Sequence, residues 1–342
     1  MTKFTISRRR ALAGLAAASS LTVLGRPALA ATKVKVGVVR LASHAPSFIA
    51  FERGYYRDEG LDVELKFYEA AQPMAEAIAT GDADYVVTAM SSGLVSLAEK
   101  DAIKVIGGAL SERKGLAGAV ILASSKAYGA GLTDPSQLRG RTFGITTAGS
   151  SFHYMCHKIA EATGIPMAQI TLQPLQTVRA IVEALGSGRI DAWAVQAGVA
   201  SKMVADGTAR QIGLVSDYAP DYQVTTVSTS TANAVNERAM TQAFVRAYSK
   251  AIGDYNAAVV EKTASPGEVA EVAKIVHKYV DSDRPFEDAR KTFVDSAMSF
   301  NRGCALALDS VKDQLQWFKA EKMVSGTITP EMLFDTSYVE II

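Results

Sequence analysis

The chain of 342 residues is 48% hydrophobic and 21% charged, with a formal net charge of +1 and only 10 prolines. This composition is that of an ordinary globular protein. It excludes a disordered or low-complexity chain, and the balanced charge argues against a nucleic-acid-binding protein. The length exceeds the size at which a single hydrophobic core usually stops growing, so we expect two domains.

The first 30 residues have the three-part pattern of a secretory signal peptide. A basic run at 8–10 precedes an apolar stretch at 11–24, and the small residues Ala28 and Ala30 offer a peptidase site. The apolar stretch is shorter than the roughly 20 residues that span a bilayer. A serine followed by two arginines resembles a twin-arginine signal, which exports folded proteins. We therefore predict a signal peptide over residues 1–30, of the twin-arginine type, with the general secretion (Sec) route as the open alternative. Either route exports the protein to the periplasm. Removal of the signal peptide leaves 31 basic and 35 acidic residues, a net charge of about −4.

Strands and helices alternate along residues 34–195. The β-branched run at 34–39 predicts a first strand, and alternating apolar and polar residues at 61–67 predict a second, half-buried strand. Apolar residues at helical spacing around Phe48 predict a helix between them. The alternation continues with strands at 85–87, 104–106, 142–145, 170–172 and 192–195, and with helices near 74–81, 94–98, 155–162 and 178–185. Such alternation predicts parallel sheets covered by helices.

The repeated pattern indicates two α/β lobes. Extended segments at 120–122 and 224–227 are placed to cross between the lobes in opposite directions, and we expect them to act as hinges. Lobe 1 is then formed by residues 31–121 and 226–342, and lobe 2 by residues 122–225. The C-terminal part of lobe 1 changes to long amphipathic helices, which we expect to pack back on that lobe.

Two adjoining motifs follow the first predicted strand. Residues 45–50 read APSFIA, and residues 53–64 read RGYYRDEGLDVE. This order resembles the opening of the NMT1/SsuA/TauA-like family, the nitrate-, sulfonate- and taurine-type substrate-binding proteins of ABC transporters. The resemblance is strong over residues 36–212 and loose in the C-terminal helices. Its further blocks lie at 77–84, 138–144, 150–151 and 184–192.

The resemblance implies an α/β, type II periplasmic binding protein fold, with two lobes joined by two crossing strands and a helical C-terminal region. It implies a solute-binding component of an ABC importer, which closes about its hinge on a ligand in the interlobe cleft. The implied partners are a permease and an ATPase, and the chain itself is expected to be a monomer that meets the membrane only through them. Members of the family take sulfonates, nitrate, thiamine precursors or aromatic acids, so the resemblance does not name the ligand.

Three loops follow strand ends, where open α/β sheets bind ligands, at residues 41–46, 88–93 and 146–154. Serines in the last two lead into helices, where they cap the helix and leave backbone N–H groups that favour an anion. Capping alone would explain these serines equally well. The predicted ligand-binding residues are His44, Met90, Ser91, Ser92, Ser150, Ser151, Phe152, His153, Gln176 and Gln196.

His44 and His153 come from opposite lobes, which predicts a clamp on the ligand. A neutral imidazole donates one hydrogen bond and accepts another, and Phe152 or Trp193 offers a flat apolar face. These groups suit a small organic anion or a heterocycle. A structural hydrogen bond explains either histidine alone equally well.

The sequence contains no catalytic or metal-binding constellation that we can assign, so we expect a protein that is not an enzyme and uses no cofactor. Pyrimidine synthases similar to this family carry a cysteine-rich block. This chain has only Cys156 and Cys304, which either form a disulfide or lie buried separately. A ligand-binding module of a sensor or chemoreceptor would use the same cleft, and the sequence does not separate it from a transport protein.

Overall fold

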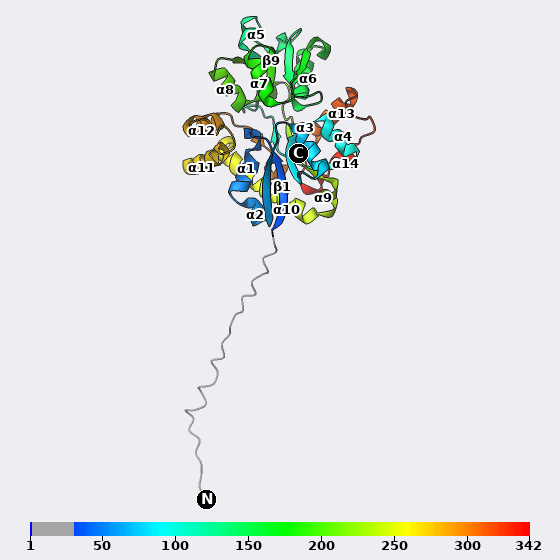
Figure 1. The fold of residues 1–342 in the computed structure, drawn as a ribbon, viewed down its shortest axis with the longest axis vertical. Helices are drawn as coiled ribbons and strands as arrows, with labels where there is room; N and C mark the ends of the chain where they lie inside the picture. Colours follow the sequence, from blue (N-terminus) through cyan, green and yellow to red (C-terminus); the bar gives the residue numbers. More distant parts are fainter. Residues whose placement is uncertain (2–30) are drawn as a thin grey trace. The chain divides into compact units, whose positions relative to one another are not determined.

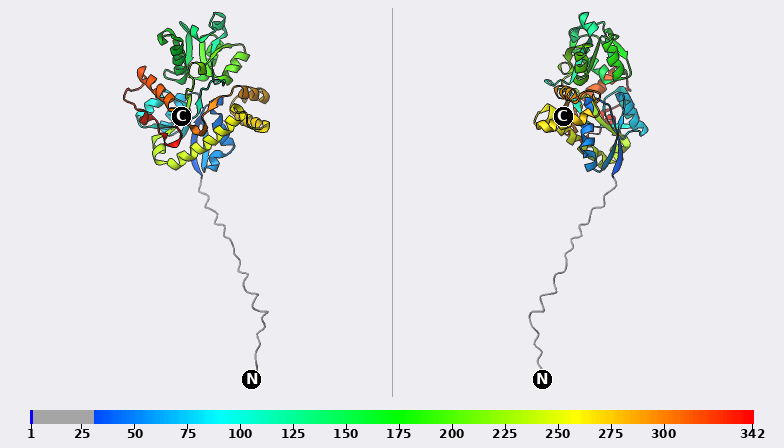
Figure 2. Two further views of the ribbon diagram at one scale, coloured as in Figure 1. Left: turned by 180° about the vertical axis from the view of Figure 1, so that it is seen from behind. Right: turned by 60° about the vertical axis from the view of Figure 1, so that its left-hand side comes forward.

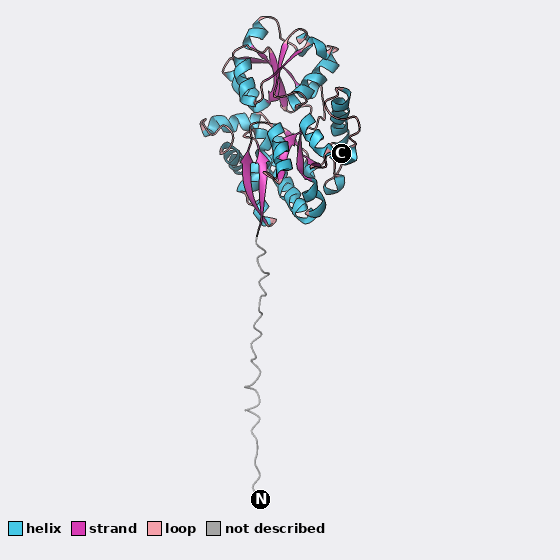
Figure 3. Ribbon diagram, turned by 45° about the vertical axis from the view of Figure 1, so that its right-hand side comes forward, coloured by secondary structure: helices cyan, strands magenta, loops and turns pink. Residues whose placement is uncertain are grey.

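The computed structural model describes Met1 and residues 31–342. Apart from Met1, the predicted signal peptide at 1–30 therefore lies outside the described residues. Two five-stranded sheets with flanking helices organise residues 31–342 (Figures 1 and 3). We refer to the parts built around the first and second sheet as lobe 1 and lobe 2.

The first sheet has the strand order β2-β1-β3-β11-β4, and the second has the order β10-β6-β9-β7-β8. The strands of the first sheet are β1 (Thr32–Val38), β2 (Leu61–Phe67), β3 (Tyr85–Ala89), β4 (Ile103–Gly108) and β11 (Thr225–Ser230). Those of the second are β6 (Ala119–Ser124), β7 (Thr142–Ile145), β8 (Thr171–Pro174), β9 (Ala192–Gln196) and β10 (Ala209–Leu214). A short ribbon pairs β5 (Leu110–Ser111) with β12 (Ser299–Phe300). Every residue of β3 and β6 is buried, because helices cover both faces of these strands.

Helices surround each sheet (Figures 1 and 2). Those of lobe 1 are α1 (Ala45–Glu52), α2 (Tyr55–Asp58), α3 (Ala71–Thr80), α4 (Ser92–Glu99) and the C-terminal set α9 (Thr231–Asn236), α10 (Arg238–Tyr255), α11 (Pro266–His277), α12 (Phe286–Asp295), α13 (Leu308–Ala320) and α14 (Pro330–Leu333). Those of lobe 2 are α5 (Ser125–Gly129), α6 (Ser151–Thr163), α7 (Val178–Gly186) and α8 (Ala197–Ala205). In the C-terminal set, α10 and α11 pack against α1, and α14 packs against α4. None of the helices that the structure describes is long and apolar enough to span a membrane.

The sheets are mixed, whereas the strand–helix alternation predicted parallel sheets. The strands β1, β2 and β3 are parallel to one another, as are β7, β8 and β9. However, β11 is antiparallel to β3 and β4, and β6 is antiparallel to β9 and β10. The chain enters β6 and β11 directly from the other lobe, so each begins at the sheet edge where its neighbours end. Alternation alone does not reveal such an entry.

Two segments, residues 112–118 and 215–224, link the sheets. They run side by side in opposite directions, and the backbone N–H of Glu112 donates to the carbonyl oxygen of Tyr222 at 2.8 Å. The segments that the sequence predicted as hinges follow directly, inside β6 and at the start of β11. Because β6 and β11 both start at these links, four strand ends meet at one edge between the lobes.

Cys156 and Cys304 are both free and buried, and they form no disulfide. Burial raises the pKa of the Cys156 thiol to about 12 and also raises that of Cys304. We expect a water-soluble disulfide reagent to label neither thiol in the folded protein and both after unfolding, because the thiolate is the reactive form. The unfolding temperature should also be the same with and without reductant. Rapid labelling of the folded chain would contradict this.

Candidate functional site

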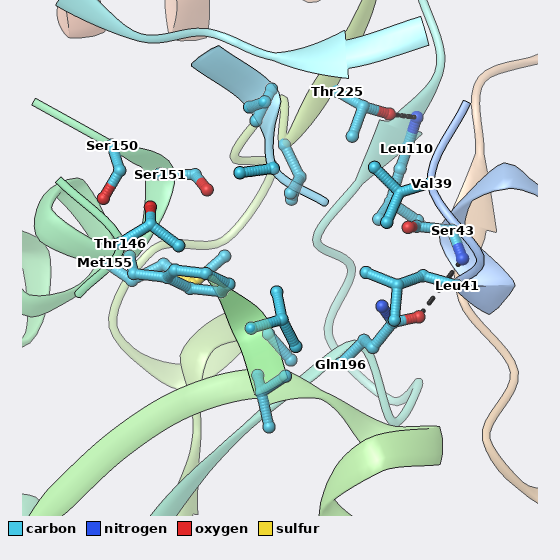
Figure 4. Close-up of a pocket in the computed structure, with 18 of the residues that line it drawn as sticks. Val39, Leu41, Ser43, Leu110, Thr146, Ser150, Ser151, Met155, Gln196 and Thr225 are labelled. Atoms are coloured by element: carbon cyan, nitrogen blue, oxygen red, sulfur yellow. Dashed lines mark hydrogen bonds between the residues drawn. The ribbon is translucent and has the colours of Figure 1, made fainter. Parts of the chain in front are cut away.

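A cavity of about 100 Å³ lies between the two lobes, at the edge where the four strand ends meet. Ala89 ends β3 and Gln196 ends β9, while Ala119 begins β6 and Thr225 begins β11, and all four line the cavity. Both lobes therefore contribute to its wall. In Figure 4, Thr146, Ser150, Ser151 and Met155 of lobe 2 lie on the left of the cavity, and Val39, Leu41, Ser43, Leu110 and Thr225 lie on the right. Gln196, also of lobe 2, lies next to Leu41 and Ser43.

Half of the predicted ligand-binding residues line this cavity, namely His44, Ser150, Ser151, Phe152 and Gln196. Ser150 is the N-cap of α6, where its hydroxyl oxygen accepts the backbone N–H of His153 at 3.4 Å. Ser151 and Phe152 then form the first turn of α6. Gln196 ends β9, and its carboxamide oxygen accepts the backbone N–H of Ser43 at 3.1 Å (Figure 4).

His44 is buried against the cavity, in the turn that leads from β1 into α1. It is 3% exposed, and its Nδ1 atom has no hydrogen-bond partner among the described residues. Burial lowers the pKa of its imidazole to about 3, so the ring is neutral at physiological pH. The ring therefore keeps a hydrogen-bonding nitrogen that no described residue uses.

The loop before α4 lies outside the cavity lining. Met90 is 1% exposed and packs in the core. Ser91 caps α4, and its hydroxyl oxygen accepts the backbone N–H of Leu94 at 3.2 Å. Ser92 instead contacts lobe 2, because its backbone N–H donates to the carbonyl oxygen of Gly149 at 3.0 Å.

His153 and Gln176 also lie outside the lining. The Nδ1 atom of His153 accepts the backbone N–H of Gly149 at 3.1 Å, and its ring meets Trp317 of α13 edge-on with centroids 5.0 Å apart. Gln176 is exposed and adopts a positive φ of 67° in the loop after β8. Trp193 is fully buried behind Phe152, with ring centroids 5.4 Å apart. The structure therefore does not bring the two predicted clamp histidines into one cavity.

A buried carboxylate, Glu112, lines the cavity and was missed at the sequence level. It is 2% exposed, and its Oε1 and Oε2 atoms accept the backbone N–H of Ala119 at 3.0 and 3.3 Å. Burial raises the pKa of this carboxyl to about 7. In sequence it is followed by exposed Arg113 and Lys114, a pattern that indicates a solvated loop and gives no sign of a buried site.

The cavity wall is largely apolar, and its described residues include no Lys or Arg. Its charged residues, among those that the structure describes, are Glu69 and Glu112. Its apolar residues include Leu41, Met74, Phe152, Met155, Val195 and Met298. The described residues contain no group of three or more His, Cys, Asp or Glu side chains placed to hold a metal ion.

Comparison with known proteins identifies the family to which this chain belongs. Residues 42–258 match the family model described as NMT1/THI5 like. The chain belongs to the NMT1/THI5-like family. No curated protein matches the sequence significantly.

Solved structures share the fold over most of their length. The ligand-binding component of an ABC-type import system from Staphylococcus aureus, with zinc bound, is 12% identical, with a TM-score of 0.70 over 90% of this chain and 97% of that one. The alkanesulfonate-binding protein SsuA from Xanthomonas axonopodis pv. citri, bound to MOPS, is 17% identical, with a TM-score of 0.69 over 89% and 98%. The nitrate-binding protein NrtA from Synechocystis is 14% identical, with a TM-score of 0.68 over 88% and 84%. The chain thus has the type II periplasmic binding protein fold, in agreement with the sequence-level expectation.

The two lobes of this family member touch on several sides of the cavity. Besides the pairs Ser43–Gln196 and Ser92–Gly149, an ion pair joins Lys202 of α8 to Asp281 at 2.7 Å. A methyl group added at Gly149, whose φ is 71°, would lie 2.2 Å from the hydroxyl oxygen of Ser92. The lobes are therefore in close contact, as in the closed form of a two-lobed binding protein.

A second cavity of about 280 Å³ adjoins the first, between α7 and α8 of lobe 2 and α11 and α12 of lobe 1. Leu41, Val178 and Gln196 line both cavities, so they form the partition between them.

Proposed function

We propose that this protein is the extracytoplasmic solute-binding component of an ABC importer, and that it holds a small organic molecule between its lobes without changing its bonds. The observation that carries the proposal is the cavity whose wall comes from both lobes. Closure of the lobes completes this wall. A ligand that contacts both lobes binds the closed form more tightly than the open form. Ligand binding therefore favours closure of the lobes about the links.

The residues that line the cavity favour a ligand with a flat, mostly apolar body, such as a heterocycle. Phe152 offers a ring face, and His44 offers a buried neutral imidazole with an unused nitrogen. An organic anion would meet the N-terminus of α6 and the hydroxyl groups of Ser150 and Ser151, but no basic side chain of the described lining. The heterocycle is therefore the better supported of the two ligand classes that the sequence indicated.

The sequence and the family support the proposed location and partners. The signal-peptide pattern of residues 1–30 supports export to the periplasm, and membership in the family supports a permease and an ATPase as partners of a monomeric binding protein. A non-enzymatic role is supported by the similar solved structures, which are binding proteins.

The decisive experiment identifies what the protein carries. The full chain is produced in a Gram-negative host, purified from the periplasmic fraction, and unfolded, and the released small molecules are identified by mass spectrometry. We expect a released compound that rebinds to the refolded protein with 1:1 stoichiometry in calorimetry. Retention of the full chain in the cytoplasm, or the absence of binding by any released or supplied metabolite, would overturn the proposal.

Substitution of the two histidines tests the site. We expect His44→Ala to weaken binding of the released compound by about tenfold or more, because it removes a buried hydrogen-bonding group from the cavity wall. His153→Ala should have a smaller effect, since His153 contacts Gly149 and Trp317 and does not line the cavity. Calorimetry of both variants measures the difference. Equal losses would argue that His153 also reaches the ligand.

A further inference from the structure

The position of Glu112 is fixed by the backbone around it. Glu112 is the first residue of the link that leads from β5 to β6, and its carboxylate accepts the N–H of Ala119 at the start of β6. Gly118 has a φ of 47°, and a methyl group there would lie 2.3 Å from Oε2 of Glu112. The carboxylate is thus held against the backbone, in the wall of the cavity, in a space that only glycine leaves free.

The charge of this carboxylate is not compensated by the protein. Glu112 takes part in no ion pair among the described residues, and the described lining contains no Lys or Arg. The buried hydroxyl of Tyr222 lies close enough for the charge of Glu112 to raise its pKa. Glu69, which has the same sign, and neutral His44 line the same cavity. Burial of an unpaired carboxylate is costly. A glutamine could still accept the N–H of Ala119 through its one carboxamide oxygen, so this bond alone does not require an acid at the position.

We propose that Glu112 is a specificity-determining residue, and that the ligand presents to it a positively charged nitrogen or a pair of N–H donors. This inference rests on the proposed function and names the ligand class of the same cavity. A charge-assisted hydrogen bond to this buried carboxylate is stronger than a neutral one. A planar amidine or protonated amino-heterocycle can pair with both carboxylate oxygens at once. The same carboxylate disfavours anions of equal size.

Binding of such a ligand depends on pH in a defined direction. The pKa of Glu112 is about 7 in the empty cavity, so the carboxyl is mostly protonated at pH 5.5 and mostly ionised at pH 8. A cation binds the ionised form, so its affinity rises over this interval by about tenfold or more, and a proton is released on binding near pH 7. A neutral compound of the same shape shows no comparable rise.

Three ring compounds of matched shape test the proposal: benzamidine, benzamide and benzoate. For the wild-type protein at pH 8, calorimetry is expected to give at least about tenfold tighter binding of benzamidine than of benzamide, with benzoate weakest. Glu112→Gln should remove the preference for benzamidine and leave benzamide binding within about threefold. Glu183→Gln is the control, since it removes one exposed charge from the outer surface of α7, outside the cavity lining.

The outcomes separate this proposal from the proposed function. Tighter binding of benzoate, unchanged benzamidine binding by Glu112→Gln, or binding of none of the three compounds by the wild-type protein would overturn the role of Glu112. A released metabolite that rebinds would still support the solute-binding function in those cases. If Glu112→Gln fails to fold, the pH dependence of benzamidine and benzamide binding to the wild-type protein decides, and parallel pH profiles would overturn the proposal.

Discussion

Gly149→Ala is expected to hold the two lobes apart and to weaken ligand binding by about tenfold or more. A methyl group at this position would lie 2.2 Å from the hydroxyl oxygen and 2.6 Å from Cβ of Ser92, distances that non-bonded atoms do not reach. Because Gly149 belongs to lobe 2 and Ser92 to lobe 1, the lobes must move apart at this contact to remove the clash. Small-angle scattering should show a larger radius of gyration with saturating ligand, and calorimetry should show the loss of affinity.

A matched control separates this clash from backbone strain. Gly164 ends α6 with a φ of 68°, close to that of Gly149, and a methyl group there would meet no atom within 4 Å. Gly164→Ala therefore carries the same strain of about 1 kcal/mol without a contact between lobes. Adding Ser92→Gly to Gly149→Ala removes both clashing atoms and should restore binding. A Gly149→Ala protein that closes and binds like the wild type would contradict the prediction.

Glu112→Gln is expected to change the stability of the ligand-free protein, relative to the wild type, more favourably at pH 8 than at pH 4.5. Burial raises the pKa of Glu112 from its ordinary value of 4.5 to about 7, so the folded state binds the proton more tightly than the unfolded state. The contribution of Glu112 to the unfolding free energy of the wild type therefore falls by about 3 kcal/mol as the pH rises from 4.5 to 7, and it stays low above pH 7. Glutamine does not titrate, so this decrease is absent in the variant.

Urea denaturation at the two pH values measures the effect. The quantity to compare is the difference in unfolding free energy between variant and wild type, because all other titrating groups then cancel. We expect this difference to be about 3 kcal/mol more favourable to the variant at pH 8 than at pH 4.5. An equal difference at both values would mean that the carboxyl of Glu112 has an ordinary pKa in the folded protein.

The periodicity of apolar residues was enough to place most strands and helices and to suggest two lobes. The directions of β6 and β11 were not predictable, because they depend on which lobe the chain leaves before it enters the strand. Pairing of Ala119 with Gln196 and of Thr225 with Ala89 sets those directions, and it is formed between segments far apart in sequence.

The candidate site was predictable only in part, because capping serines look alike in sequence. Ser150 and Ser91 both accept a backbone N–H three residues later, yet only Ser150 lines the cavity. Helical geometry separates the residues of α6: Phe152 and Met155 are three apart and share the face that meets the cavity, while His153 turns toward α13. Sequence alone does not fix which face of a helix meets the other lobe.

Glu112, which we propose as a recognition group, lies in one of the two side-by-side links about which we expect the lobes to move. Lys114 is exposed and lies two residues after Glu112 in the first link. An environment-sensitive dye attached through Lys114→Cys would therefore sit next to the proposed ligand contact and on the proposed hinge. Because both native cysteines are buried, labelling would be confined to that position. A change in the fluorescence of this dye would therefore report ligand binding and the accompanying movement of the lobes.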